Sequence, residues 1–139
     1  MANRPKPILA EMENVEEAIR NLHDAMSRQE KTVVELAAVA TFMHNFYNGI
    51  ENILKQYLGL RNIRIQKSEN WHKDLLNLSV IQGIITTALC DELFEYLSFR
   101  HFFVHSYGFM LEQAPLEALA QNVPDVWQRF ISETESLSS

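Results

Sequence analysis

The sequence predicts an all-α fold, an antiparallel bundle of four or five helices that forms a single domain over residues 1–139. Three observations lead to this prediction. The chain has only four glycines and four prolines, so we expect few turns and long helices. Apolar residues recur three and four positions apart, and no segment alternates as a strand would. With 47% hydrophobic and 22% charged residues, the composition is typical of a globular domain with a buried core.

The first helix is predicted by the apolar residues that recur three and four positions apart between Ile8 and Met26. Pro7 precedes them, and proline suits the first turn of a helix because the N–H that it lacks would have no partner there. We expect this helix to end near residues 27–30, where the apolar spacing stops.

A second helix is predicted from near Thr32 to Leu58, with Gly59 as its C-cap because glycine readily adopts the left-handed conformation. Its first part, VVELAAVATFMHNF, is apolar nearly all round. A surface helix is apolar on one side only, so this helix is expected to lie at the centre of the bundle or beneath another chain. The connector that follows, residues 60–70, is basic, with Arg61, Arg64 and Lys67.

The third and fourth helices are expected on either side of a short turn. The third is predicted over about residues 71–84. Thr86 or Thr87 is expected to cap the fourth, because a threonine hydroxyl accepts a hydrogen bond from the first turn of a helix. The fourth helix is predicted to run to about Tyr107, where Gly108 would end it.

The fifth helix is expected to open at Pro115. Pro124 lies within its apolar pattern and is predicted to break or kink it, because proline lacks a backbone donor and its ring clashes with the preceding turn. The tail near residues 133–139 is polar and is expected to fray.

Composition also bounds the surroundings and the partners of the chain. Cys90 is the sole cysteine, there is no signal-peptide pattern, and no apolar run is long enough to span a membrane, so we expect a cytoplasmic protein without a membrane partner. The net charge of −6 argues against binding nucleic acid through a broad positive field. An RNA-binding function would therefore need a local positive pocket or a partner that supplies charge.

The segment FRHFFVHSYG places polar side chains in one of the most apolar parts of the chain. At about 100° per residue, Arg100 and Tyr107 share one stripe of a helix, and His101 and His105 share another. His105 then lies about 140° round the helix from Arg100. For both to act at one point, the helix must open near His105, Arg100 must wrap round it, or a second chain must bring its own copy.

Arginine and histidine without an acidic cluster suit the cleavage of RNA. A ribose hydroxyl can attack the neighbouring phosphorus once a base removes its proton, and His105 is suited to act as base or acid near neutral pH. The phosphorane that forms carries extra negative charge, which Arg100 can stabilise. This chemistry needs no metal and no cofactor.

Three segments resemble one family. Arg100, His105 and Tyr107 form the pattern R-x4-H-x-Y, and FRHFFVHSYG resembles the motif helix of HEPN-domain ribonuclease toxins (HepT-like). HNFYNGIENILK, residues 44–55, is similar to the second helix of these domains, and NWHKDLL, residues 70–76, is similar to a segment before the motif helix. The resemblance covers about residues 33–108.

The resemblance implies a homodimer whose cleft is built from two copies of the motif, with metal-independent cleavage of tRNA or mRNA by Arg100 and His105. It also implies a partner, a minimal nucleotidyltransferase (MNT) that acts as the antitoxin. Such a partner would transfer AMP units to Tyr107, which would fill the cleft with bulk and negative charge. His101 and residues of the second helix are auxiliary candidates: Tyr47, Asn48 and Glu51.

Other interpretations of these residues remain open. His101 is also suited to a structural role, and Tyr107 to packing at a helix end. Arg100 is also suited to a structural ion pair with Glu95 or Glu51, a role that can coexist with catalysis. His101 and His105 are spaced to share a metal, with Asp91, Glu95 or His72 as a third ligand, but no metalloprotease pattern is present and we predict no metal site.

Two other functions compete with a nuclease. One is a non-catalytic HEPN module that binds a nucleotide or docks a nucleotidyltransferase, and the other is a helical dimer with a structural role. The presence of Arg100, His105 and Tyr107 together favours the nuclease, whereas the acidic net charge favours a docking module.

Overall fold

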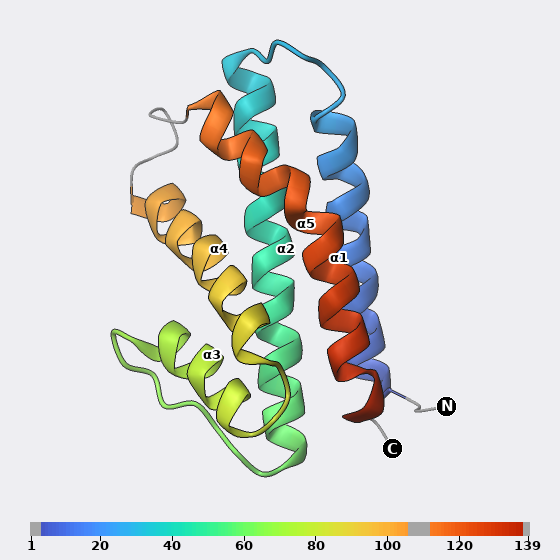
Figure 1. Cartoon of the computed structure of the whole chain (residues 1–139), viewed down its shortest axis with the longest axis vertical. Helices are drawn as coiled ribbons and strands as arrows, with labels where there is room; N and C mark the ends of the chain where they lie inside the picture. The colour runs from blue at the N-terminus through green and yellow to red at the C-terminus, as the bar shows by residue number, and fades with distance from the viewer. Residues whose placement is uncertain (1–3, 106–111, 138–139) are drawn as a thin grey trace.

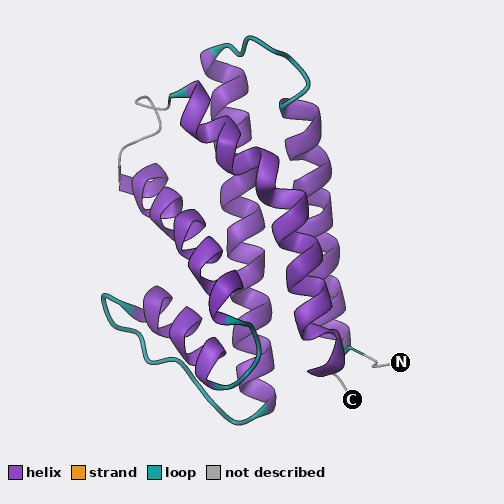
Figure 2. Ribbon diagram, viewed as in Figure 1, coloured by secondary structure: helices purple, strands orange, loops and turns teal. Residues whose placement is uncertain are grey.

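The computed structural model describes residues 4–105 and 112–137, and every regular element in these ranges is helical (Figures 1 and 2). The all-α prediction is confirmed. Five α-helices and a final 3-10 turn follow one another along the described parts of the chain: α1 Lys6–Ala25, α2 Val33–Leu60, α3 Trp71–Ile81, α4 Thr87–His105, α5 Gln113–Thr134 and η1 Glu135–Leu137.

The long helix α2 lies at the centre of the bundle and contacts each of the other four α-helices. Figure 1 shows α3 and α4 along one side of α2 and α1 along the other, with α5 crossing in front. The prediction that this apolar segment is central is thus confirmed. Its first turn is the exception, because Val33 and Val34 are 78% and 77% exposed.

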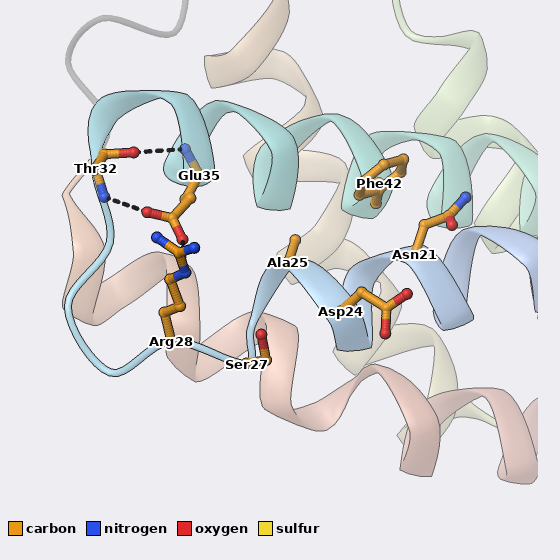
Figure 3. A pocket seen from close by; sticks show the side chains of 8 residues that line it. All are labelled: Asn21, Asp24, Ala25, Ser27, Arg28, Thr32, Glu35 and Phe42. Atoms are coloured by element: carbon orange, nitrogen blue, oxygen red, sulfur yellow. Dashed lines mark hydrogen bonds and ion pairs between the residues drawn. The ribbon is translucent and has the colours of Figure 1, made fainter.

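The start of α2 is fixed by a capping box. Thr32 Oγ1 accepts a hydrogen bond from the Glu35 backbone N–H at 3.3 Å, and the Glu35 carboxylate accepts one from the Thr32 N–H at 3.0 Å (Figure 3). Two N–H groups that the helix cannot pair are satisfied in this way. Arg28 adds an ion pair to Glu35 at 3.3 Å, so the connector from α1 is tied to the same turn (Figure 3).

The C-terminal end of α2 differs from the prediction. Gly59 is not the C-cap, because the helix continues to Leu60 and Arg61 caps it. The left-handed residue is Asn62, at φ 61°, a conformation that asparagine tolerates better than most residues. The Asn62 and Ile63 N–H groups donate back to the carbonyls of Gly59 and Leu58, both at 3.0 Å, so the last turn is closed without a left-handed glycine.

Two other helices end earlier than predicted. Helix α1 stops at Ala25 rather than near residues 27–30, and α3 stops at Ile81 rather than at residue 84. After α3 the chain turns through Gly83 at φ 72°, a conformation that glycine adopts without steric cost.

Helix α4 begins as expected with a threonine cap, and the cap is Thr86. Its Oγ1 accepts a hydrogen bond from the Leu89 N–H at 3.2 Å. The Thr86 N–H and hydroxyl both donate to the Glu133 carboxylate of α5, at 2.7 and 2.9 Å, which joins the two helices. The predicted stop at Tyr107 and Gly108 lies outside the described residues.

Helix α5 corrects the prediction for Pro124, because it runs without a break from Gln113 to Thr134 with Pro124 inside it. Pro124 is exposed, so its ring requires no space in the core. The polar tail is also packed as far as Leu137: Thr134 is fully buried, and Arg4 donates to its Oγ1 at 2.8 Å and to the Tyr57 hydroxyl at 2.7 Å. The N-terminal segment and the end of α5 are thereby tied to α2.

The core runs along α2, where it meets α1 especially closely. Val15 of α1 packs against Gly49 of α2, and a Cβ on Gly49 would lie 2.2 Å from Val15 Cγ2. Among the described residues, no helix is both long and apolar enough to cross a membrane.

Candidate functional site

Four polar or aromatic residues of α2 lie on one stripe, at positions i, i+3, i+4 and i+7. They are His44, Tyr47, Asn48 and Glu51. Residues with this spacing share one face of a helix. Contacts with Arg100 of α4 and His72 of α3 show that this face looks toward those two helices. The structure thus brings three of the predicted auxiliary residues, Tyr47, Asn48 and Glu51, to the side of α2 from which Arg100 is contacted.

Arg100 is held by an amide and not by a carboxylate. Its Nε donates to Asn48 Oδ1 at 3.3 Å, and Asn48 Nδ2 lies 3.0 Å from Nε2 of His44. The alternative left open by the sequence, an ion pair of Arg100 with Glu51 or Glu95, does not form among the described residues. The two terminal nitrogens of the guanidinium, the fork that matches a phosphate in shape, have no hydrogen-bond partner in the same ranges.

Glu51 pairs instead with His72, for which the sequence suggested only the role of a third metal ligand. The Nδ1 of His72 lies 2.8 and 3.0 Å from the two carboxylate oxygens of Glu51. The Glu51 side chain is 3% exposed and that of His72 is 18% exposed. A buried carboxylate requires such a partner, because removing its water is costly. The pair also explains why Glu51 does not reach Arg100.

The pKa values of two groups on the stripe reflect their burial. Burial raises the pKa of Tyr47 above its usual range, and the nearby Glu51 carboxylate raises it further. The Tyr47 hydroxyl has no hydrogen-bond partner among the described residues. The pKa of His44 is lowered, first by burial and then by the positive charge of Arg100. Both shifts favour neutral side chains in the α2–α4 interface.

His101 and His105 lie on another stripe of α4 from Arg100, and of the two only His101 lines the same hollow as Arg100 among the described residues. Both are exposed in the last turns of α4, with their ring centroids 4.4 Å apart. Two apolar side chains beside them, Phe102 and Val104, are 39% and 46% exposed. Because α4 remains helical as far as His105, the five-residue spacing places His105 about 140° round the helix from Arg100. Tyr107 lies outside the described residues.

A groove between α3 and α4 gathers positive and titratable side chains. Its volume is about 350 Å³, and Arg100 lines it together with His72, Lys73 and His101. Among the described residues, Glu69 is the one carboxylate in its wall, and the remaining lining residues are Asn70, Phe94, Leu97 and Ser98. With Lys73 and Arg100 against one carboxylate, the lining carries more positive than negative side chains.

The comparison with protein families decides the assignment. The family model described as HepT-like protein matches residues 38–139, most of the chain. The chain belongs to the HepT-like family. A search of curated proteins finds no match.

Solved structures share the fold of this HepT-like chain at low sequence identity. A chain in the crystal structure of a toxin–antitoxin with AMP-PNP aligns with a TM-score of 0.80 at 14% identity, covering 93% of this chain and 97% of the other. A chain in the structure of tri-AMPylated Shewanella oneidensis HEPN toxin in complex with MNT antitoxin aligns at 0.80 and 15% identity, covering 95% and 98%. A protein from Thermus thermophilus aligns at 0.61 and 17% identity, covering 90% and 99%.

For two residues of this HepT-like chain, His44 and His72, the sequence did not predict the contacts that the structure shows. His44 was noted only within a matching segment, and His72 was not placed beside Glu51. The sequence signal was the recurrence of histidines within the matching segments HNFYNGIENILK and NWHKDLL. The described residues contain no group of three or more His, Cys, Asp or Glu side chains arranged to hold a metal ion.

Proposed function

We propose that this chain is a cytoplasmic endoribonuclease toxin that cuts tRNA or mRNA without a metal. Arg100 and His105 from two copies of the chain would form the cleft. A nucleotidyltransferase antitoxin would neutralise the toxin by transferring AMP to Tyr107. Membership of the HepT-like family supports this proposal, as does the fold shared with an AMPylated HEPN toxin bound to MNT antitoxin.

The hydrogen bonding of Arg100 is the main structural support for the proposal. Asn48 fixes the Nε of Arg100 but does not neutralise it, and the terminal nitrogens of the guanidinium have no partner among the described residues. A structural arginine in a partly buried position normally pairs with a carboxylate. An arginine that is oriented by an amide and left charged beside an open groove is suited to a phosphodiester.

The proposed dimer would form through the last turns of α4. His105 is exposed there and lies about 140° round the helix from its own Arg100 by spacing, which favours a site that takes the two groups from different copies. Exposed Phe102 and Val104 flank it, and their burial would favour contact with another copy. In a two-fold dimer that pairs these turns, each His105 would face the motif of the partner.

RNA cleavage by the purified chain tests the proposal. Total tRNA and a messenger RNA are incubated in EDTA with wild type and with His105→Ala, after intact-mass measurement has established that Tyr107 carries no AMP. We expect wild type to cut RNA and His105→Ala to cut it at least about 10²-fold more slowly. Unmodified wild type that leaves both RNAs intact would contradict the proposal.

The net charge of −6 favours one alternative, a non-catalytic HEPN module that binds a nucleotide or docks a nucleotidyltransferase. Such a module has no use for a proton carrier at position 105. It would bind the nucleotidyltransferase equally well as wild type and as His105→Ala, and neither form would cut RNA.

A further inference from the structure

We propose that His72 is a catalytic base of the same site, an inference that rests on the proposed ribonuclease function. RNA cleavage of this kind requires two proton transfers. The 2′-hydroxyl loses a proton as its oxygen bonds to phosphorus, and the 5′-oxygen gains one as its bond to phosphorus breaks. His105 can carry one of these protons. The structure offers His72 for the other.

The contact with Glu51 fixes which ring nitrogen of His72 is available. Nδ1 donates to the buried Glu51 carboxylate, so in the neutral ring the lone pair is on Nε2. Nε2 of His72 has no hydrogen-bond partner among the described residues. The buried polar atoms without a partner in these ranges are on His44 and Tyr47, so Nε2 of His72 is not enclosed in the same way. A histidine oriented by a carboxylate through Nδ1, with Nε2 free, is arranged to accept a proton.

The position of His72 is as important as its tautomer. His72 and Arg100 line the same groove of about 350 Å³ between α3 and α4. A phosphodiester bound by the terminal nitrogens of Arg100 would therefore bring the adjacent ribose into the groove that His72 lines. The Trp71 ring lies against the imidazole, with centroids 3.6 Å apart, and helps to hold its orientation.

The charged groups around His72 come from each neighbouring element. Glu51 and Lys55 belong to α2, with Lys55 over the Trp71 ring at 4.1 Å from its centroid, and Glu69 lies just before α3. Lys73, Arg100 and His101 line the groove with it. Glu51 is in direct contact and is buried, so it is the group expected to stabilise the imidazolium after the proton is accepted. The assignment gives His72 the 2′-hydroxyl proton and leaves His105 to protonate the 5′-oxygen.

A structural role for His72 must be separated from a catalytic one, because removing the imidazole leaves Glu51 buried without a partner. His72→Asn is suited to this, since the Asn amide nitrogen takes the place of Nδ1 and can still donate to Glu51, while Nε2 is lost. His72→Ala removes both nitrogens. Circular dichroism and thermal unfolding establish which variants are folded.

The test measures RNA cleavage against pH for full-length wild type, His72→Asn and His105→Ala. We expect folded His72→Asn to cut about 10²- to 10⁴-fold more slowly. The pH profile of His72→Asn should lack the acidic limb that the wild-type profile shows. Added imidazole should restore part of the rate of His72→Asn. A ribonucleotide 3′-aryl phosphate, whose leaving group needs no proton, should reduce the defect of His105→Ala but not that of His72→Asn.

Failure of this inference is distinguishable from failure of the proposed function. If wild type cuts RNA and folded His72→Asn cuts it at the same rate with the same pH profile, His72 is not the base and the ribonuclease assignment stands. If His72→Asn cuts more slowly, but imidazole does not restore its rate and its pH profile matches that of wild type, His72 acts only structurally. If unmodified wild type does not cut RNA, both proposals are wrong.

Discussion

Replacing Gly49 with alanine tests whether the contact between α1 and α2 determines the packing of the site helix. The new Cβ would lie 2.2 Å from Val15 Cγ2, so this methyl group has to retreat by about 1.2 Å to reach ordinary contact at 3.4 Å. Val15 is fully buried, and a β-branched side chain in a helix has one strongly preferred rotamer. The helices must therefore shift, which costs about 1–3 kcal/mol.

Gly59→Ala is the matched control, because Gly59 lies in the same helix and its Cβ would meet nothing within 4 Å. Alanine is favoured over glycine in a helix by up to about 1 kcal/mol at either position. In urea unfolding, Gly49→Ala should thus be less stable than Gly59→Ala by about 1–3 kcal/mol. Adding Val15→Ala to Gly49→Ala should cost less than Val15→Ala costs in wild type. Equal stability of the two glycine variants would refute the close contact.

Three other predictions concern the fold and the site helix. Arg4→Met should lower the free energy of unfolding by about 2 kcal/mol in urea, because it removes three hydrogen bonds, one of them to buried Thr134. Pro124→Ala should raise it by about 1–2 kcal/mol in the same assay, because an exposed helical position regains a backbone donor. The lowered pKa of His44 means that the unfolded chain binds its proton more readily, so stability should fall as the pH drops below about 6.5. Between pH 5 and 7, the unfolding temperature of His44→Gln should change less with pH than that of wild type. An equal dependence on pH would contradict the assigned burial beside Arg100.

The sequence predicted the helices well because their signals are local. Spacing of apolar residues marks each helix, and Thr32 and Thr86 mark two starts through hydrogen bonds within one turn. Helix ends were predicted less well. Asn62 and not Gly59 adopts the left-handed conformation after α2, and both residue types are able to do so. Which of them ends the helix depends on where the connector must go next, and that is set by tertiary packing.

The site shows the same limit more clearly. The sequence left open an ion pair of Arg100 with a carboxylate such as Glu51. Asn48 and Glu51 are almost one turn apart on α2, so each faces a different part of the neighbouring helices. Asn48 meets Arg100 of α4, and Glu51 meets His72 of α3. These pairings depend on where α3 and α4 cross α2, which no local spacing encodes.

The acidic net charge is compatible with the proposed binding of phosphate in the groove, because the charges are unevenly placed. Glu51, a carboxylate of α2 beside the groove, is buried and paired with His72, so it does not present its charge at the surface. Beyond Trp71, a second hollow of about 390 Å³ is lined by three basic residues, two of them from the predicted basic connector: Lys55, Arg64 and Lys67. Because Trp71 borders this hollow and packs against His72 of the first groove, the positive side chains extend from the connector to Arg100. A field local to this face would act on an RNA backbone over about a Debye length, roughly 8–10 Å, and charges farther away than that contribute little to it.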